Sequence, residues 1–427
     1  MHATPRAFGR RSFLTTSLLI AGGAVLTGCS SDPMKKNAGD SAGAKITLNQ
    51  WYHAYGEQGT QDAVKRYAQA YTKANPDVAI NITWVAGDYE TKLNSSLLTA
   101  DAPDLFEIGD FRHQMVKNGQ LAPLDDILGA AKSEFAKADL DGATVDGKVY
   151  GIKMIDDIMM LYYRRSVLDK AGITPPKTYA ELVEAARALT TAKMKGLFVG
   201  NDGIGDAGYL MAWSAGGTLL EGAKIAFDRP ETAAAIGALR QLHDSKSLLL
   251  DFTTDWFDPG ALTQKATAMH WCGLWAMPDI KKSLGDDFGV VPWPAFGASG
   301  RPTARLGGWY ELVNAKSKHV EAAKKYVQWL WLQQADLQKD WCVSYGFHVP
   351  PRASVAAQTT EFGAGAPKEA VAISQKYGTS FPNLWNTAMA TAFNDAVTKI
   401  AKQHADPAAA LAKATAACQA ELDKQLG

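Results

Sequence analysis

The sequence predicts an α/β protein with two hydrophobic cores. Stretches with alternating apolar residues are followed by amphipathic helical stretches, and this succession recurs along the chain. Strand–helix–strand order favours a parallel sheet with helices on both faces. The 427 residues are enough for two cores, because a single core stops growing at about 250–300 residues.

The first elements are predicted before residue 110. Residues 45–51 (KITLNQW) alternate as a strand, and a helix is predicted from about Thr60 to Asn75. Residues 80–84 alternate again as a second strand, and residues 104–108 form a short third one. This part of the chain therefore has the strand–helix alternation of a parallel sheet.

The same alternation returns after residue 148. Thr178 and Glu181 form a capping box that starts a helix, and residues 292–302 (PWPAFGASGRP) are rich enough in Gly and Pro to predict a crossing between the two cores. The other predicted elements are strands at 149–154, 159–163 and 196–200, a helix starting at Pro230, and an Ala-rich amphipathic helix after Pro407.

The beginning of the chain predicts export. Arg10 and Arg11 precede an apolar run of about 13 residues, which is short of the roughly 20 that span a bilayer. Residues 26–29 (LTGC) resemble a bacterial lipobox, so we expect a signal peptide over 1–28 and a lipid on Cys29. The paired arginines resemble a twin-arginine signal, and export by the Sec or the Tat route stays open. An ordinary secretory signal with a chance Cys is the alternative.

Residues 29–44 are predicted to be a lipidated tether. They are small, polar and patternless, and such a segment spans about 20 Å on average. The signal and the tether together predict a folded domain that is held at the outer face of a bacterial cell membrane. Without residues 1–28, which contain three of the 44 basic residues and none of the 44 acidic ones, the net charge is −3. This balance argues against nucleic-acid binding.

The cysteines outside the signal leave one disulfide open. Cys272 and Cys342 each follow a Trp in loop-like sequence and are the candidate pair for an oxidising location. Spacing alone cannot fix this pairing. Cys418 falls on a helical pattern and is expected to be a buried free thiol, and no Cys spacing predicts a metal site.

Familiar catalytic motifs are missing from the sequence. It has no Gly-x-Ser-x-Gly elbow, His-Glu-x-x-His helix or phosphate-binding loop. Residues 200–206 (GNDGIGD) resemble a calcium loop but lack its closing glutamate, so a polar turn is the preferred interpretation. We expect no metal and no cofactor.

Aromatic residues provide the positive signal. Of 12 tryptophans, Trp275, Trp309 and Trp385 lie beside Gly, Pro or Asn instead of on helical stripes. An indole covers the flat C–H face of a sugar, while carboxylates and guanidinium groups bind its hydroxyls. The polar candidates for such a site are Asp110, Asp157, Asp202 and Arg352. The alternative for each Trp is a packing role.

Six segments in order carry a family resemblance: 75–80 (NPDVAI), 102–105 (APDL), 161–165 (LYYRR), 171–178 (AGITPPKT), 265–269 (KATAM) followed by Gly273 and Trp275, and 307–309 (GGW). Together they resemble the extracellular solute-binding proteins of ABC sugar importers, the family that includes maltose-binding protein. The resemblance covers essentially the whole chain after the signal.

This resemblance implies a periplasmic-binding-protein-like (type II) fold with a hinge and an interlobe cleft. The N-terminal lobe would contain residues 45–152 and 296–338, and the C-terminal lobe residues 153–295 and 339–427. A monomer would close around its ligand and dock on the permease subunits of an ABC importer.

The resemblance also implies roles for site residues. Asp110 and Asp157 fall where carboxylates bind sugar hydroxyls, Trp275 matches a stacking tryptophan, and Trp385 falls near another. Trp309, beside Gly308, matches a recurrent position. Four further ligand contacts are expected from loop location alone: Tyr52, His53, Asp202 and Arg352.

Three functions stay open at this level. The first is a membrane-anchored receptor for a sugar or oligosaccharide. The second is a receptor for a glycerophosphodiester or other polyol-like solute, with Arg352 and Arg305 as the candidate phosphate ligands. The third is a surface glycosidase that uses two of Asp110, Asp157 and Asp202.

Overall fold

The computed structural model describes residues 44–55 and 59–426. The predicted signal peptide (1–28), the lipidation site Cys29 and all but the last residue of the predicted tether (29–44) lie outside the described residues. Within the described residues, no helix combines the length and apolar character needed to cross a membrane.

A nine-stranded sheet runs through the fold in the order β2-β1-β3-β12-β6-β10-β7, with β11 paired to β6 and β13 to β12. β1 is parallel to β2 and β3, whereas β12 is antiparallel to both β3 and β6. The strands of this sheet are β1 (Ile46–His53), β2 (Val78–Val85), β3 (Leu105–Ile108), β6 (Ile152–Tyr163), β7 (Lys195–Phe198), β10 (Thr267–Gly273), β11 (Gly289–Val291), β12 (Ala304–Val313) and β13 (Gly378–Thr379). Two small ribbons pair β4 (Thr144–Val145) with β5 (Lys148–Val149) and β8 (Leu220–Glu221) with β9 (Lys224–Ile225).

Helices cover the sheet as the alternating pattern predicts. α1 buries Val64, Tyr67 and Tyr71 on one face, and the Thr178–Glu181 capping box starts α7. The helices of the first part are α1 (Thr60–Ala74), α2 (Tyr89–Ser96), α3 (His113–Lys117), α4 (Asp125–Leu128), η1 (Gly129–Glu134), α5 (Lys137–Gly142), α6 (Arg165–Ala171), α7 (Tyr179–Leu189) and α8 (Ala207–Ser214). The later ones are α9 (Pro230–Asp244), α10 (Gly260–Thr263), η2 (Leu274–Ala276), α11 (Met277–Leu284), α12 (Val320–Val327), η3 (Gln328–Gln333), α13 (Ala335–Asp340), η4 (Trp341–Tyr345), α14 (Ala353–Ala356), α15 (Gly365–Tyr377), α16 (Thr387–Gln403) and α17 (Pro407–Leu426).

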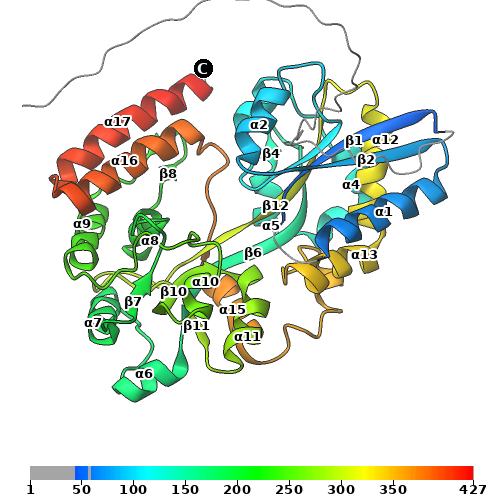
Figure 1. Cartoon of the computed structure of the whole chain (residues 1–427). Coiled ribbons are helices and arrows are strands. Elements are labelled where there is room, and N and C mark those ends of the chain that lie inside the picture. Colours follow the sequence, from blue (N-terminus) through cyan, green and yellow to red (C-terminus); the bar gives the residue numbers. More distant parts are fainter. Residues whose placement is uncertain (1–43, 56–58, 427) are drawn as a thin grey trace, which may run out of the picture. The chain divides into compact units, whose positions relative to one another are not determined.

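Two long strands connect the two lobes. The first residues of β6 pack in a core with α1 and β1, and its last residues pack in a second core with α7 and α16. β12 runs in the opposite direction beside it, so Leu312 lies in the first core and Ala304 in a third apolar cluster with Met160 of β6. Figure 1 shows these two strands passing between the group of α1, α2 and α12 and the group of α8, α9 and α16.

The buried apolar residues separate as a two-lobed chain requires. The first core takes residues from 48–155 and 310–342, and the second from 159–293 and 385–422. Trp341 and Cys342 pack in the first core, so the lobe boundary that we propose lies beyond residue 342, a few residues later than expected.

The predicted crossing at 292–302 is wrong. Trp293 is fully buried in the second core, and its backbone pairs with Thr303. Residues 292–302 therefore form a loop of the second lobe, and the chain crosses along β12 instead.

The predicted Cys272–Cys342 disulfide is also wrong. Cys272 lies on β10 among apolar residues of the second lobe, and Cys342 is in the first core, where its thiol donates to the Met154 carbonyl. All three cysteines in the described part of the chain are free and buried, which confirms the expectation for Cys418.

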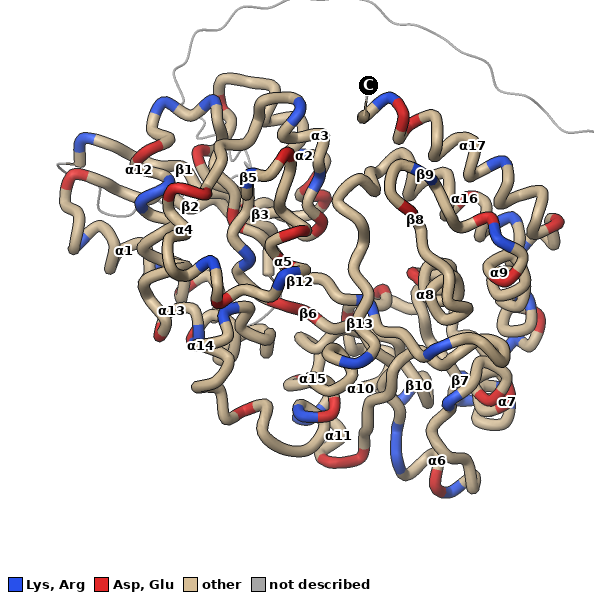
Figure 2. Tube along the Cα trace, turned by 180° about the vertical axis from the view of Figure 1, so that it is seen from behind, with Lys and Arg blue, Asp and Glu red and all other residues tan. Residues whose placement is uncertain are grey.

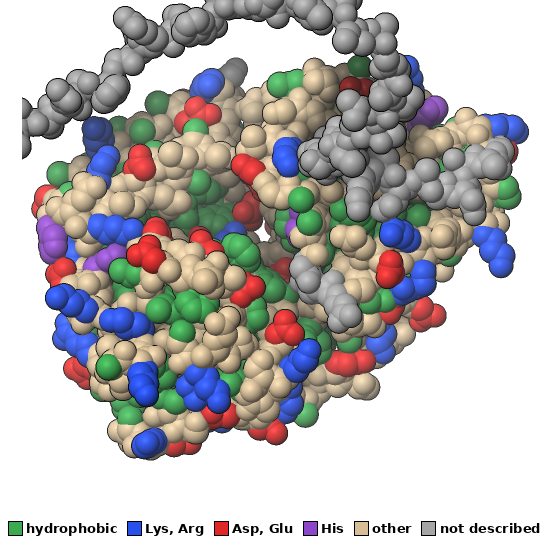
Figure 3. All heavy atoms as spheres, viewed as in Figure 1, with side chains coloured by type: hydrophobic (Ala, Val, Ile, Leu, Met, Phe, Trp, Pro, Cys, Tyr) green, Lys and Arg blue, Asp and Glu red, His purple; other side chains and the backbone are tan. Residues whose placement is uncertain are grey.

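Charged residues of both signs are interspersed over both lobes. Figure 2 shows this along the described part of the trace, and Figure 3 shows it on the face drawn there. In the part of the chain that the structure describes, the charged residues are therefore not segregated by sign.

Candidate functional site

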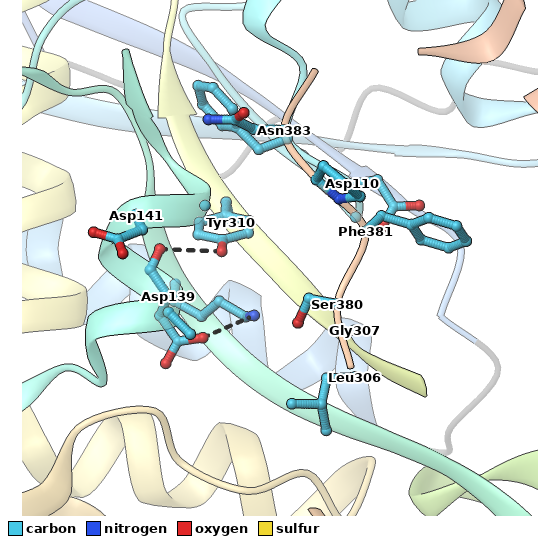
Figure 4. Close-up of a pocket in the computed structure, with 15 residues that line it drawn as sticks. Asp110, Asp139, Asp141, Leu306, Gly307, Tyr310, Ser380, Phe381 and Asn383 are labelled. Atoms are coloured by element: carbon cyan, nitrogen blue, oxygen red, sulfur yellow. Dashed lines mark hydrogen bonds and ion pairs between the residues drawn. The ribbon is translucent and has the colours of Figure 1, made fainter. Parts of the chain in front are cut away.

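A cavity of about 290 Å³ lies where the two long strands meet loops from both lobes. Its first wall follows β3 and includes residues 109–111, and its second is α5 with residues 138–142. Residues 380–383, which precede α16, form the third. Lys153 of β6 and Tyr310 of β12 lie between these walls, and Figure 4 shows the labelled side chains around the space.

The side chains of this cavity combine carboxylates, aromatic rings and an amide. The carboxylates are those of Asp110, Asp139 and Asp141, the rings those of Phe111, Tyr310 and Phe381, and the amide that of Asn383. Carboxylates accept hydrogen bonds from hydroxyls, an amide both accepts and donates them, and rings pack on C–H faces. The donor set therefore suits a small polyhydroxylated molecule.

The positive charge of Lys153 is balanced by carboxylates of the protein. Its Nζ lies 3.2 Å from Asp139 and 3.1 Å from Asp156, and over the Tyr310 ring at 4.8 Å. Burial opposes the charged form, but Asp156, Tyr310 and Asp139 hold the pKa of Lys153 well above its usual value. Burial also raises the pKa of Asp156 to about 7, against the opposing effect of Lys153. The ammonium group is thus paired with carboxylates of the protein.

Arg305 is likewise paired with carboxylates of the protein. Its guanidinium binds Asp206, and its Nη2 lies 3.3 Å from Oδ2 of Asp110. The guanidinium also lies over the Phe381 ring, 4.8 Å from its centre. Burial opposes the charge, but the two carboxylates raise the pKa of Arg305 above its ordinary value.

An aromatic group stands behind the first wall. The His53 and Trp309 rings stack with centres 4.0 Å apart, and the His53 Nδ1 lies 2.6 Å from Glu107. A Cβ added at Gly109 would come within 3.7 Å of the Trp309 ring, so the indole packs against this glycine of the cavity wall. The Tyr55 hydroxyl also donates to Glu107, at 2.7 Å, which fixes the group.

The structure brings some predicted site residues together. Asp110 lines the cavity, and Gly308 lies in β12 beside the lining residue Gly307. Trp309 packs against the lining residue Gly109, and His53 stacks on Trp309. These four stay candidates for ligand contact.

Two other predicted residues lie elsewhere. The Asp202 carboxylate accepts from the backbone N–H groups of Ile204 and Gly205, which confirms the polar turn, and it lines a separate cavity of about 350 Å³. The Trp275 indole packs on the second lobe and donates to the Phe257 carbonyl at 2.8 Å, and it is absent from the cavity lining.

Tyr52 and Trp385 are core residues, and neither lines this cavity. Tyr52 is 0% exposed on β1, which lies between β2 and β3, and Gln50 donates to its hydroxyl. Trp385 is buried against Phe227 and Phe393 of the second core. An apolar environment outweighed the loop-like sequence around each.

Arg352 forms an ion pair and Asp157 a buried polar contact, and neither residue lines the cavity. Arg352 binds Glu134 through two nitrogens, at 3.1 and 2.9 Å, which removes it as a phosphate ligand. Asp157 is 3% exposed, and its Oδ1 lies 2.5 Å from Nδ1 of His348. Both placements have the same cause, because a buried polar or charged side chain needs a partner.

Sequence reasoning missed Lys153, Asp139, Tyr310 and Phe381. Lys153 is the basic residue of an otherwise apolar strand that also holds Asp156 and Asp157, which was a usable signal. Phe381 lies in the loop that was singled out for Trp385. Asp139 carried no signal, because its role depends on where α5 packs. Among the described residues, no group of three or more His, Cys, Asp or Glu is placed to hold a metal ion.

The sheet order, the two cores and the crossing strands define a two-lobed type II binding-protein fold. Two solved structures share it. The GacH receptor of Streptomyces glaucescens GLA.O is 23% identical with a TM-score of 0.74, covering 89% of this chain and 99% of that chain. An ABC transporter solute-binding protein of Thermotoga lettingae TMO, bound with alpha-D-tagatose, is 20% identical with a TM-score of 0.75, covering 88% and 100%.

The chain belongs to the bacterial extracellular solute-binding proteins, whose family model matches residues 66–373. The arabinooligosaccharide-binding protein of Bacillus subtilis (strain 168) is 24% identical over 355 residues, 78% of each chain. The lactose-binding protein of Rhizobium radiobacter is 30% identical over 155 residues, 33% of this chain and 36% of that protein. The expected family is thereby confirmed.

Proposed function

We propose that this protein is a lipid-anchored receptor that binds a neutral sugar or oligosaccharide and delivers it to an ABC importer. The cavity between the crossing strands carries the proposal, because it combines three carboxylates, three rings and an amide. Several of the relatives are named for arabino-oligosaccharides, lactose, or melibiose, raffinose and stachyose. Closure by hinge bending would follow, because ligand contacts to both lobes favour the closed state.

The charges of the site argue against the phosphodiester alternative. Arg305 and Arg352, the two candidate phosphate ligands, are held by carboxylates of the protein. Lys153 is held in the same way, and the lining has three carboxylates for one ammonium. A phosphate would therefore meet net repulsion in this cavity.

The glycosidase alternative has little support in the arrangement of the acids. Hydrolysis needs two carboxyl groups roughly 5–10 Å apart on either side of one bond. Asp110 lines the cavity, Asp157 is buried against His348, and Asp202 lines another cavity. We therefore propose a receptor without hydrolytic activity.

The lipid anchor has its own part in the proposal. A lipid on Cys29 and a tether of about 20 Å would keep the receptor, as a monomer, at the outer face of the membrane beside its permease subunits. Tethering raises the local concentration at that partner. Cys29→Ser should move the full-length protein from the membrane fraction to the medium or the periplasm; unchanged membrane association would contradict the anchor.

Calorimetry on residues 30–427 tests the ligand. The panel contains arabinotriose, raffinose, lactose, maltotriose and glycerophosphocholine. We expect saturable binding of at least one sugar, a loss of about tenfold or more with Asp110→Asn, and unchanged binding with Asp169→Asn on the exposed face of α6. Silence toward every sugar, or tighter binding of glycerophosphocholine, would overturn the proposal. Chromatography of the bound sugar after long incubation tests for hydrolysis.

A further inference from the structure

Arg305 joins carboxylates of both lobes beside the cavity. It binds Asp206, the N-cap residue of α8 in the second lobe, and Asp110, which follows β3 in the first. Arg305 itself lies near the start of β12, one of the two strands that connect the lobes. One side chain thus links a carboxylate of the cavity wall to a carboxylate of the opposite lobe.

The two arms of this link are unequal. The side chains of Arg305 and Asp206 are 14% and 17% exposed, whereas that of Asp110 is 46% exposed. The Asp110 arm is one N–H to one oxygen at 3.3 Å. Since a carboxylate has about four acceptor positions, Asp110 can accept ligand hydroxyls while Arg305 holds it.

Phe381 fixes the plane of the guanidinium. The ring lies 4.8 Å below Arg305 and 4.8 Å from Tyr209 of the second core, and it also lines the cavity. A planar guanidinium can stack on a ring and bind two carboxylates at once, which an ammonium cannot do in the same way.

We propose that Arg305 is a positioning residue for ligand binding, which orients the Asp110 carboxylate at the cavity and ties it to the second lobe through Asp206. Contact between ligand and Asp110 and contact between the lobes then depend on each other. The ligand effect rests on the proposed sugar function, whereas the link between the lobes exists without any ligand.

The link is tested first without ligand, on residues 30–427. Spin labels at Lys73→Cys of α1 and Glu231→Cys of α9, both exposed positions, report the distance between the lobes. We expect Arg305→Gln and Asp206→Asn each to broaden the distribution of distances between the two labels. Distributions identical to that of the parent protein in both variants would overturn the link.

The positioning role is tested with arabinotriose as the probe, in a double-mutant cycle by calorimetry. Arg305→Gln is expected to raise Kd about tenfold, Arg305→Lys less, and Arg305→Gln to add nothing in the Asp110→Asn background. Additive losses would contradict positioning through Asp110. Arg240→Gln, which removes a part-buried arginine bound to backbone carbonyls of the second lobe, is the matched control with unchanged Kd.

The two tests separate the two proposals. If neither arabinotriose nor any other sugar binds the parent protein, the proposed sugar function is wrong. The distances between the labels still decide whether Arg305 links the lobes. If a sugar binds but the cycle is additive and the distances are unchanged, only the role of Arg305 fails.

Discussion

Asp157 and His348 connect two segments that cross between the lobes. Asp157 belongs to β6 and His348 to the segment after η4, and their Oδ1 and Nδ1 atoms are 2.5 Å apart. Both residues are buried, with 3% and 5% of their surface exposed. Beside them, the backbones of Asp156 and Val349 exchange two hydrogen bonds. The crossing region is thus held by a buried polar contact instead of apolar packing alone.

Asp157→Asn should destabilise the fold while changing sugar affinity little. Asp157→Asn weakens a contact between two buried polar side chains, which costs about 1–3 kcal/mol, whereas Asp286→Asn, in the exposed pair with Lys281, should leave stability nearly unchanged. Urea unfolding measures both variants, and calorimetry measures the affinity. A large rise in Kd with unchanged stability would instead make Asp157 a ligand contact, as the family resemblance implied.

Gly308→Ala should be far more damaging than Gly307→Ala. The backbone φ angle of Gly308 is +124°, which residues other than glycine rarely adopt. A Cβ there would also lie 2.0 Å from the Ile155 carbonyl oxygen of β6. At Gly307 the nearest atom is the mobile end of Met159, at 2.8 Å. We expect Gly308→Ala to lower Tm by more than about 8 °C or to prevent folding, since backbone strain adds to the lost strand pairing. Equal Tm values for the two variants would contradict this.

Asp156 should make stability fall as pH rises. Its pKa is raised to about 7 by burial, so the folded protein holds a proton that the unfolded chain has released. The contribution is fully present below the pKa of the unfolded carboxyl, about 3.9, and is lost as pH rises toward 7. Relative to Asp156→Asn, the parent protein should therefore lose stability between pH 5 and pH 8. Parallel urea-unfolding curves at these pH values would refute it.

Trp309→Ala should weaken sugar binding more than Trp329→Ala. Trp309 stacks on His53 and approaches the cavity at Gly109, whereas Trp329 packs on Tyr71 and Tyr326 of the first lobe. We expect a rise in Kd of about tenfold or more for Trp309→Ala, near 1.4 kcal/mol. Trp309→Phe should retain much of the affinity. Equal effects at both tryptophans would remove Trp309 from the site.

The buried thiols should titrate only after unfolding. In residues 30–427, Cys272, Cys342 and Cys418 are free and buried, and burial raises the pKa of each thiol. An Ellman titration without reductant should give slow reaction in the native protein and three thiols in guanidinium chloride. A single reactive thiol after unfolding would show a disulfide.

Much of the fold was predictable because it depends on local patterns. The α1 stripe and the α7 capping box are readable within a few residues, and β6 is a single apolar run broken by charges. The crossing point was not, because the Gly/Pro-rich loop around Trp293 and the glycines of β12 carry similar local signals. Only the second core, which buries Trp293, distinguishes them.

The candidate site was predictable by residue type more than by position. Asp110, Gly308 and Trp309 lie at or beside the cavity, but Tyr52 and Trp385 are in cores. An aromatic residue near a loop can turn toward solvent or toward the core, and the local sequence is compatible with either orientation. The choice depends on the apolar neighbours that the sheet brings together.

By itself, the sequence determined the α/β class, the family and the chemistry available for a ligand, since periodicity, motif order and composition are properties of the chain. Tertiary structure alone decided which charges remain for that ligand. Arg305, Arg352, Lys153 and Asp157 are each paired with a residue 3 to 218 positions away. A buried charge must find a partner, and that partner is set by the packing of distant segments.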